Sequence, residues 1–185
     1  MIILEGADLS GKTTLANLIR QKYGSRIVHL GVPAHGKRHW DELRESLNAQ
    51  PNNNVVFDRA CLGSIVYGKI KQDEGNKYPV TYEELASFLK YARQNELLFI
   101  HARAHVKTIA ERYDIRGDSY LSLEQILFAR EEYEDLFTDV ALTCHVIEYN
   151  STLISASDFV NRWFSFMNTA LYSNRSIHFA EGLFR

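Results

Sequence analysis

The chain has 185 residues, of which 45% are hydrophobic and 12% aromatic, so it is long and apolar enough for one domain with a sizeable core. Its formal net charge of -2 does not favour a basic coat for nucleic acid, and no apolar run approaches the roughly 20 residues of a membrane-spanning helix. Cys61 and Cys144 stand in no metal-binding spacing and predict a reducing compartment, and the first residues turn polar too soon for a signal peptide. We therefore expect a cytoplasmic protein that forms one domain over residues 1–185 and binds neither nucleic acid nor membrane.

The first half of the chain alternates short apolar runs with amphipathic stretches. Apolar runs at 2–4, 26–30 and 55–57 are typical of buried strands. Helical spacing is found at 13–22, in the stretch that carries Trp40, Leu43 and Leu47, and at 62–70. Pro51 and the asparagines beside it end the second helix, and the polar residues 71–79 are expected to form a mobile loop.

The second half continues this alternation. Two pairs with capping-box spacing, Thr81 with Glu84 and Ser122 with Gln125, predict the starts of two helices. Short buried strands between helices predict an α/β fold, a three-layer sandwich with a five-stranded parallel sheet and helices on both faces. The structure of the tail from Ser173 stays open. The remaining expected elements are strands at 97–100 and 145–149 and helices at 106–113 and 159–167.

A glycine-rich segment follows the first expected strand. It reads Gly-Ala-Asp-Leu-Ser-Gly-Lys-Thr and matches the phosphate-binding pattern G-x-x-x-x-G-K-[ST] in full. Glycines let such a loop curl so that its N–H groups point at phosphate oxygens, and the next helix presents its positive end. Lys12 is expected to reach the β- and γ-phosphates, and the Thr13 hydroxyl to bind Mg²⁺. The expected ATP-binding residues are Gly6, Ser10, Gly11, Lys12, Thr13 and Thr14.

Asp58 and Arg59 follow the strand at 55–57. Ligands of parallel α/β sheets bind at the carboxyl ends of the strands, so Asp58 is expected to orient Mg²⁺ or its waters. Arg59 beside it is expected to grip a phosphate through its bidentate fork. The alternative is an ordinary surface ion pair.

Arginines also mark a turn between two later helices. Arg112 and Arg116 precede Gly117 and Asp118 and predict a lid, about 106–122, that neutralises charge during phosphoryl transfer and excludes water. The alternative is a solvated helix face, because Glu111 and Asp114 in the same stretch are also charged. Arg130 is expected to make surface ion pairs, and the seven histidines have no metal-ligand spacing.

Together these residues resemble the thymidylate kinase family. The resemblance implies phosphorylation of dTMP by ATP with Mg²⁺, and a homodimer, although the region that pairs the family's subunits is shortened here. Small-molecule nucleotides are therefore the expected partners. The implied catalytic residues are Lys12, Asp8, Arg59, Arg112 and Arg116. The implied acceptor site has Asp8 at the sugar, Arg59 at the phosphate, and Arg38, Ser64 and Tyr67 at the base end, with Tyr67 crowding out a 2′-hydroxyl.

Departures from the family keep other functions open. Gly31-Val32-Pro33 stands where the family has Arg-Glu-Pro, and Trp40 is either a replacement stacking face or a core residue. A deoxynucleoside kinase is the nearest alternative and needs a general base, for which Asp8, Glu5 or Asp58 could serve. A non-catalytic nucleotide-binding regulator is the second. A signalling GTPase is disfavoured, because Asn76-Lys77-Tyr78-Pro79 fails the guanine pattern N-K-x-D at its last position.

Overall fold

The computed structural model describes residues 1–30, 39–49, 54–70 and 80–163. Its centre is one five-stranded sheet with the strand order β2-β3-β1-β4-β5, in which every neighbouring pair is parallel. This confirms the expected α/β fold with a five-stranded parallel sheet. The strands are β1 (Ile2–Glu5), β2 (Arg26–His29), β3 (Val55–Asp58), β4 (Leu98–Arg103) and β5 (His145–Asn150).

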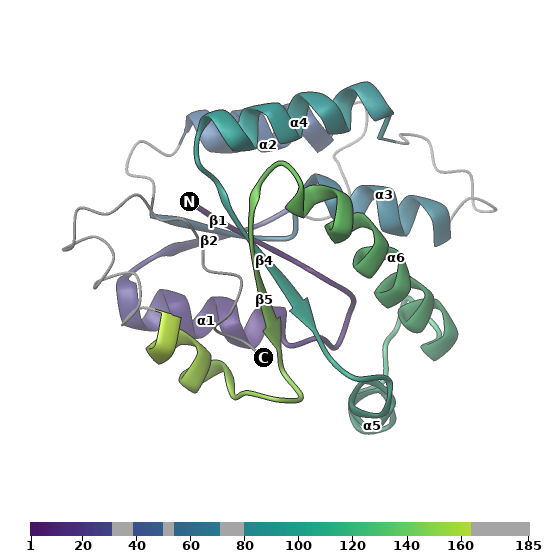
Figure 1. Ribbon diagram of the computed structural model, residues 1–185. Helices are drawn as coiled ribbons and strands as arrows, with labels where there is room; N and C mark the ends of the chain where they lie inside the picture. Colours follow the sequence, from purple (N-terminus) through teal and green to yellow (C-terminus); the bar gives the residue numbers. More distant parts are fainter. Residues whose placement is uncertain (31–38, 50–53, 71–79, 164–185) are drawn as a thin grey trace.

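Helices cover both faces of the sheet (Figure 1). A further helix occupies 156–163, where the described part of the chain ends. The predicted loop at 71–79, the rest of the expected last helix and the tail lie outside the described residues. The labelled helices are α1 (Lys12–Tyr23), α2 (His39–Asn48), α3 (Cys61–Ile70), α4 (Tyr82–Gln94), α5 (Val106–Arg116) and α6 (Leu123–Ala141).

Alternating side chains on the strands separate the core into two layers. Ile3 and Phe57 face one layer, where they contact buried residues of α2, α3, α4 and α6. Leu4 and Val56 face the opposite layer, which is closed by α1 and the helix at 156–163. Because successive strand residues point to opposite faces, four-residue strands supply both layers. The three-layer sandwich predicted from the sequence is therefore confirmed.

The predicted capping boxes start two of the helices. Thr81 Oγ1 accepts the N–H of Glu84 at 3.2 Å, and the Thr81 N–H donates to the Glu84 side chain at 2.8 Å. Ser122 and Gln125 make the same reciprocal pair at the start of α6. Each pair satisfies helix-end N–H groups that have no partner within the helix. Helix α5 runs to Arg116, three residues further than its apolar spacing predicted, and ends at Gly117.

Trp40 belongs to the core. Its ring meets the rings of Phe88 and Tyr91 edge-on, at centroid distances of 5.7 Å and 5.5 Å. Of the two interpretations left open by the sequence, the structure favours packing between α2 and α4 over a stacking face for a ligand.

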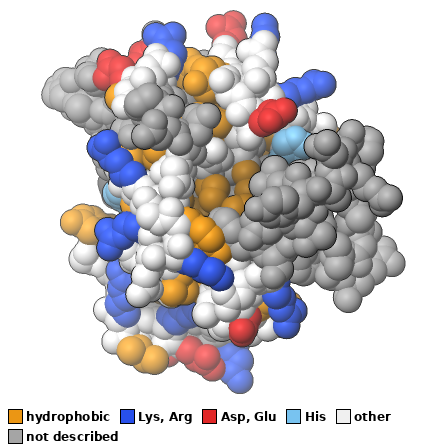
Figure 2. Space-filling model, turned by 90° about the vertical axis from the view of Figure 1, so that its left-hand side faces the viewer, with side chains coloured by type: hydrophobic (Ala, Val, Ile, Leu, Met, Phe, Trp, Pro, Cys, Tyr) orange, Lys and Arg blue, Asp and Glu red, His pale blue; other side chains and the backbone are white. Residues whose placement is uncertain are grey.

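The surface carries scattered basic groups. Lys and Arg side chains lie between hydrophobic and uncharged side chains on the face shown in Figure 2. Within the described residues, no helix is both long and apolar enough to cross a membrane.

Candidate active site

The phosphate-binding loop joins β1, in the middle of the sheet, to the start of α1. Gly6 has a φ of +145°, and a Cβ placed there would lie 2.1 Å from the carbonyl oxygen of Ala102 on β4. Gly11 precedes α1 in a left-handed conformation, with φ at +95°. Both positions therefore require glycine, one for close approach to a strand and one for backbone conformation. The central strand thus delivers the loop to the carboxyl edge of the sheet, where such folds bind ligands.

Lys12 lies inside the loop. Its ammonium donates to the carbonyl oxygens of Gly6 and Ala7, each at 2.6 Å, and the residue is only 5% exposed. Burial, together with the positive charge of Arg59, lowers the Lys12 pKa from 10.5 to about 8. Because little water surrounds this cation, an anionic ligand such as a polyphosphate attracts it strongly. Thr13 and Thr14 follow Lys12 in the first turn of α1, whose N–H groups have no acceptor within the helix.

Thr13 and Asp58 come together at the ends of α1 and β3. Thr13 Oγ1 donates to Asp58 Oδ2 at 3.3 Å, and His29 Nδ1 lies 3.6 Å from the same oxygen. The other carboxylate oxygen, Asp58 Oδ1, is buried and has no hydrogen-bond partner among the described residues. A hydroxyl and an unsatisfied carboxylate oxygen fit Mg²⁺, which prefers oxygen ligands and keeps several waters. Within the described part of the chain, no group of three or more His, Cys, Asp or Glu side chains forms a complete metal cage.

Asp8, Arg59 and Tyr67 form a connected group beside the loop. Asp8 Oδ1 accepts from the Arg59 guanidinium, and Asp8 Oδ2 accepts from the Tyr67 hydroxyl at 2.9 Å. The Arg59 guanidinium also lies over the Tyr67 ring, 4.8 Å from its centroid. One carboxylate of the phosphate-binding loop therefore binds both a guanidinium, from the residue after β3, and a phenol from α3.

The charges in this group depend on burial and on one another. Burial disfavours the Arg59 cation, but the surrounding Tyr67 and Asp8 outweigh that effect and raise its pKa above the ordinary value. Burial raises the Tyr67 pKa well above 10. Arg59 therefore stays a cation and Tyr67 a neutral hydroxyl donor at any physiological pH.

Arg112, on α5, also contacts the loop. Its Nη1 donates to the carbonyl oxygen of Leu9 at 2.6 Å and to Ser151 Oγ at 2.9 Å. Arg112 is thus bound to the loop backbone and to the turn after β5, which differs from a solvated helix face. Arg116 is exposed at the end of α5 and makes no side-chain hydrogen bond or ion pair with the described residues.

The remaining sequence candidates lie in different surroundings. Ser64 sits on α3, and its Oγ is buried without a hydrogen-bond partner among the described residues. Ser10 Oγ, in the loop, is likewise buried without a hydrogen-bond partner among the described residues. Arg38 lies outside the described residues. Arg130 pairs with Glu134 at 3.3 Å, as expected of an ion-pairing residue.

Glu5 has a larger role in the structure than the sequence indicates. The sequence suggests it only as an alternative general base, whereas the structure buries it completely beneath the site. Oε1 accepts the N–H groups of Ala60 and Gly63, and Oε2 accepts the Tyr133 hydroxyl. The available signal was its position two residues after Ile3, on the same face of the strand, because that face is covered by α3 and α6.

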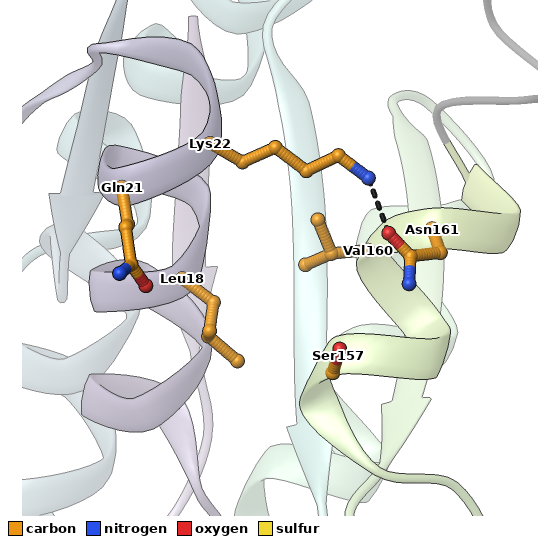
Figure 3. Close-up of a pocket in the computed structure, with 6 residues that line it drawn as sticks. All are labelled: Leu18, Gln21, Lys22, Ser157, Val160 and Asn161. Carbon is orange, nitrogen blue, oxygen red and sulfur yellow. Dashed lines mark hydrogen bonds between the residues drawn. The ribbon is translucent and has the colours of Figure 1, made fainter.

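A hollow of about 280 Å³ lies away from this group, between α1 and the helix at 156–163 (Figure 3). Its lining residues belong to the later turns of α1 and to the facing helix, and Lys22 donates to Asn161 across it. It contains none of the residues of the phosphate-binding loop. The lining residues are Leu18, Gln21, Lys22, Ser157, Val160 and Asn161.

Comparison with known proteins bears on the fold. No protein-family model matches the chain, and no curated protein matches its sequence. Among solved structures, the YorR protein of Bacillus subtilis, in complex with phosphorylated GDP, has a TM-score of 0.76 at 19% identity over 95% of this chain and 99% of its own. The deoxyadenosine kinase of M. mycoides, with the products dCMP and dCDP bound, has a TM-score of 0.61 at 17% identity, over 91% and 98%. The thymidylate kinase of Candida albicans has a TM-score of 0.59 at 13% identity, over 91% and 90%. At these identities the likeness establishes the fold alone, which this chain shares with the three proteins.

Proposed function

We propose that this chain transfers the γ-phosphoryl group of ATP to the 5′-phosphate of a deoxynucleoside monophosphate, with dTMP as the preferred acceptor. The observation that carries the proposal is the group formed by Asp8, Arg59 and Tyr67. It puts a permanent cation and an aromatic ring next to a complete phosphate-binding loop. That arrangement can hold two phosphorylated ligands side by side, one on the loop and one on the guanidinium. The likeness of the fold to that of a thymidylate kinase supports the same function.

On the donor side, Lys12 and the N–H groups of the loop bind the phosphates of ATP. Thr13 and Asp58 would hold Mg²⁺, which neutralises charge on the phosphates when bound. Arg112, already fixed to the loop through Leu9, and Arg116 on the proposed lid at 106–122 close over the transfer and exclude water.

On the acceptor side, Arg59 binds the 5′-phosphate and Asp8 the sugar, while Ser64, Tyr67 and Arg38 line the base end. The acceptor phosphate is already anionic, so the reaction needs alignment of the two phosphates rather than a strong base. One P–O bond to the donor breaks and one P–O bond to the acceptor forms, yielding ADP and a deoxynucleoside diphosphate.

One observation favours a second candidate, a deoxynucleoside kinase. Asp58 Oδ1 is buried and unsatisfied among the described residues, and a carboxylate in that state can accept the proton of a 5′-hydroxyl. The likeness to a deoxyadenosine kinase supports this alternative equally well. The two candidates differ in the acceptor atom, an anionic phosphate oxygen or a neutral hydroxyl.

A panel of acceptors separates them. Purified protein with ATP and Mg²⁺ is incubated with the four common deoxynucleoside monophosphates, their ribose counterparts and the deoxynucleosides, and ADP is measured. The Lys12→Ala variant is the control for contaminating kinases. We expect turnover with dTMP. Turnover with nucleosides alone supports the second candidate, and no turnover with any acceptor contradicts both and favours a nucleotide-binding regulator.

A further inference from the structure

Glu5 ends the central strand immediately before the phosphate-binding loop. It is 0% exposed, although burying a carboxylate is costly unless hydrogen bonds compensate for the lost water. Ile3 and Glu5 lie on the same face of β1, and Ile3 belongs to the core layer that α3 and α6 cover. The contacts of Glu5 therefore lie between the strand and these two helices.

Both carboxylate oxygens have partners. Oε1 accepts the N–H of Ala60 at 2.7 Å and that of Gly63 at 3.3 Å, and Oε2 accepts the Tyr133 hydroxyl at 2.9 Å. Ala60 directly precedes α3, and Gly63 is the third residue of that helix. Glu5 therefore satisfies the N–H of the third helical residue, which an N-cap side chain normally satisfies, and the N–H of the residue before the helix, which a capping box satisfies.

The helix supplies no such group itself. Ala60 has no polar side chain, and the first turn of α3 has no acidic residue. A negative charge at this end of a helix is also electrostatically favourable. The cap of α3 thus comes from a strand residue more than fifty positions earlier in the chain.

The same contacts fix the backbone of Arg59. Its φ is +74°, a left-handed conformation that non-glycine residues seldom adopt. The N–H of Arg59 donates to the carbonyl oxygen of Leu4 at 3.0 Å, and the next N–H, that of Ala60, donates to Glu5. Two consecutive residues of β1 therefore hold the peptide units on both sides of Arg59.

The pocket around the carboxylate is closely fitted. A Cβ on Gly63 would lie 3.2 Å from the Tyr133 hydroxyl oxygen and 3.5 Å from Glu5 Oε2. The first distance is a tight contact and the second an ordinary one, and Gly63 has no unusual φ, so a side chain here would be disfavoured by space rather than by backbone conformation. The N-terminus of α3 therefore lies against Glu5 and Tyr133 with little room to spare.

We infer that Glu5 is a positioning residue of the acceptor site: by capping α3 and holding the peptide after Arg59, it sets the direction of the Arg59 guanidinium and the place of Tyr67. Glu5 acts through these residues and touches no substrate. The inference rests on the proposed function, in which Arg59 binds the acceptor phosphate.

The test combines Glu5→Ala, the conservative Glu5→Gln and Arg59→Ala. Loss of charge-assisted hydrogen bonds in Glu5→Ala is expected to raise the acceptor KM about tenfold. The KM for ATP should stay within about twofold of wild type, because the loop residues are unchanged. Glu5→Gln keeps an oxygen for Ala60 and is expected to restore most of the acceptor affinity. Added to Arg59→Ala, Glu5→Ala should cause a smaller further loss of acceptor affinity than it causes in wild type, because only its effect through Tyr67 remains.

Controls separate positioning from general destabilisation. Val140→Ala removes buried volume at the far end of α6 and is expected to leave the acceptor KM unchanged. Amide exchange at residues 60 and 63 should be faster in Glu5→Ala, a readout that needs no activity. If Glu5→Ala does not fold, Gly63→Ala disturbs the same pocket from α3. It should raise the KM for the acceptor and leave the KM for ATP unchanged.

The outcomes are distinguishable. Equal changes in both KM values, or additive effects of Glu5→Ala and Arg59→Ala, would overturn the role of Glu5 while leaving the kinase intact. A wild-type protein that phosphorylates no acceptor would overturn the proposed function, and the inference with it.

Discussion

Replacing Lys12 by Met tests the electrostatics of the phosphate-binding loop. The difference between the ordinary pKa of 10.5 and the lowered value of about 8 corresponds to about 3 kcal/mol of unfavourable charge burial. Against this, the charged ammonium donates two hydrogen bonds to loop carbonyls, each contributing about 1.5 kcal/mol. The two contributions roughly cancel, so without nucleotide Lys12→Met should be about as stable as wild type.

Bound nucleotide should make wild type clearly more stable than Lys12→Met. A ligand at about 100 times its Kd raises the free energy of unfolding by about 2.7 kcal/mol. Wild type should gain this amount from ATP with Mg²⁺, whereas Lys12→Met should gain little, because the cation facing the phosphates is missing. Urea unfolding of both proteins, with and without nucleotide, measures the four free energies of unfolding.

The pH dependence follows from the sign of the pKa change. Between pH 8 and 10.5 the unfolded chain binds the Lys12 proton and the folded protein does not, so this residue's contribution to stability rises with pH. Any stability advantage of Lys12→Met should therefore shrink above pH 8. A variant that loses more than about 2 kcal/mol without nucleotide, or that is stabilised by ATP as much as wild type, would refute the reasoning.

Four further expectations concern the rest of the molecule. Arg59→Ala should weaken acceptor binding by about 2–4 kcal/mol and leave ATP binding unchanged, as measured by titration calorimetry; loss of ATP affinity alone would contradict the assignment. Tyr67→Ala should narrow the preference for deoxyribonucleotides, expected at about 10- to 200-fold in kcat/KM, and an unchanged ratio would exclude Tyr67 from the sugar pocket. Amide exchange across 112–118 should slow when both substrates are bound, and unchanged protection would argue against a lid. Burial lowers the His101 pKa to about 3, so the folded protein should lose stability as the pH falls from 6.5 towards 3, and His101→Phe should reduce that loss in urea unfolding at pH 4 and 7.

The sequence predicted the fold because its signals are local. Each strand is a short apolar run, each long helix carries a periodic face, and the capping pairs at Thr81 and Ser122 mark helix starts. Gly11 is likewise required by its own backbone conformation. Such features depend on residues within a few positions of one another, so they can be read along the chain.

The site was predictable only where a motif fixed it. The loop itself indicates Lys12 and Thr13, but the pairing of Asp8 with both Arg59 and Tyr67 depends on how β3 and α3 pack beside β1. Glu5 shows most clearly what cannot be predicted from the sequence. A glutamate at a strand end looks like the start of a polar loop, and only the approach of α3 and α6 makes it a buried acceptor. The contact of Arg112 with Leu9 similarly depends on the placement of α5.

The strand order has a consequence for how the chain folds as it is synthesised. The strand β1 precedes the other four in the sequence but lies in the middle of the sheet, and its neighbours on either side are β3 and β4. Its register partners begin at Val56 on one side and Leu98 on the other, so neither edge of β1 can pair until those segments leave the ribosome. Pairing between distant segments also makes folding slow and leaves strand edges exposed to other chains. The sheet that supports the phosphate-binding loop is therefore complete around β1 only after the segment that begins at Leu98 has been made.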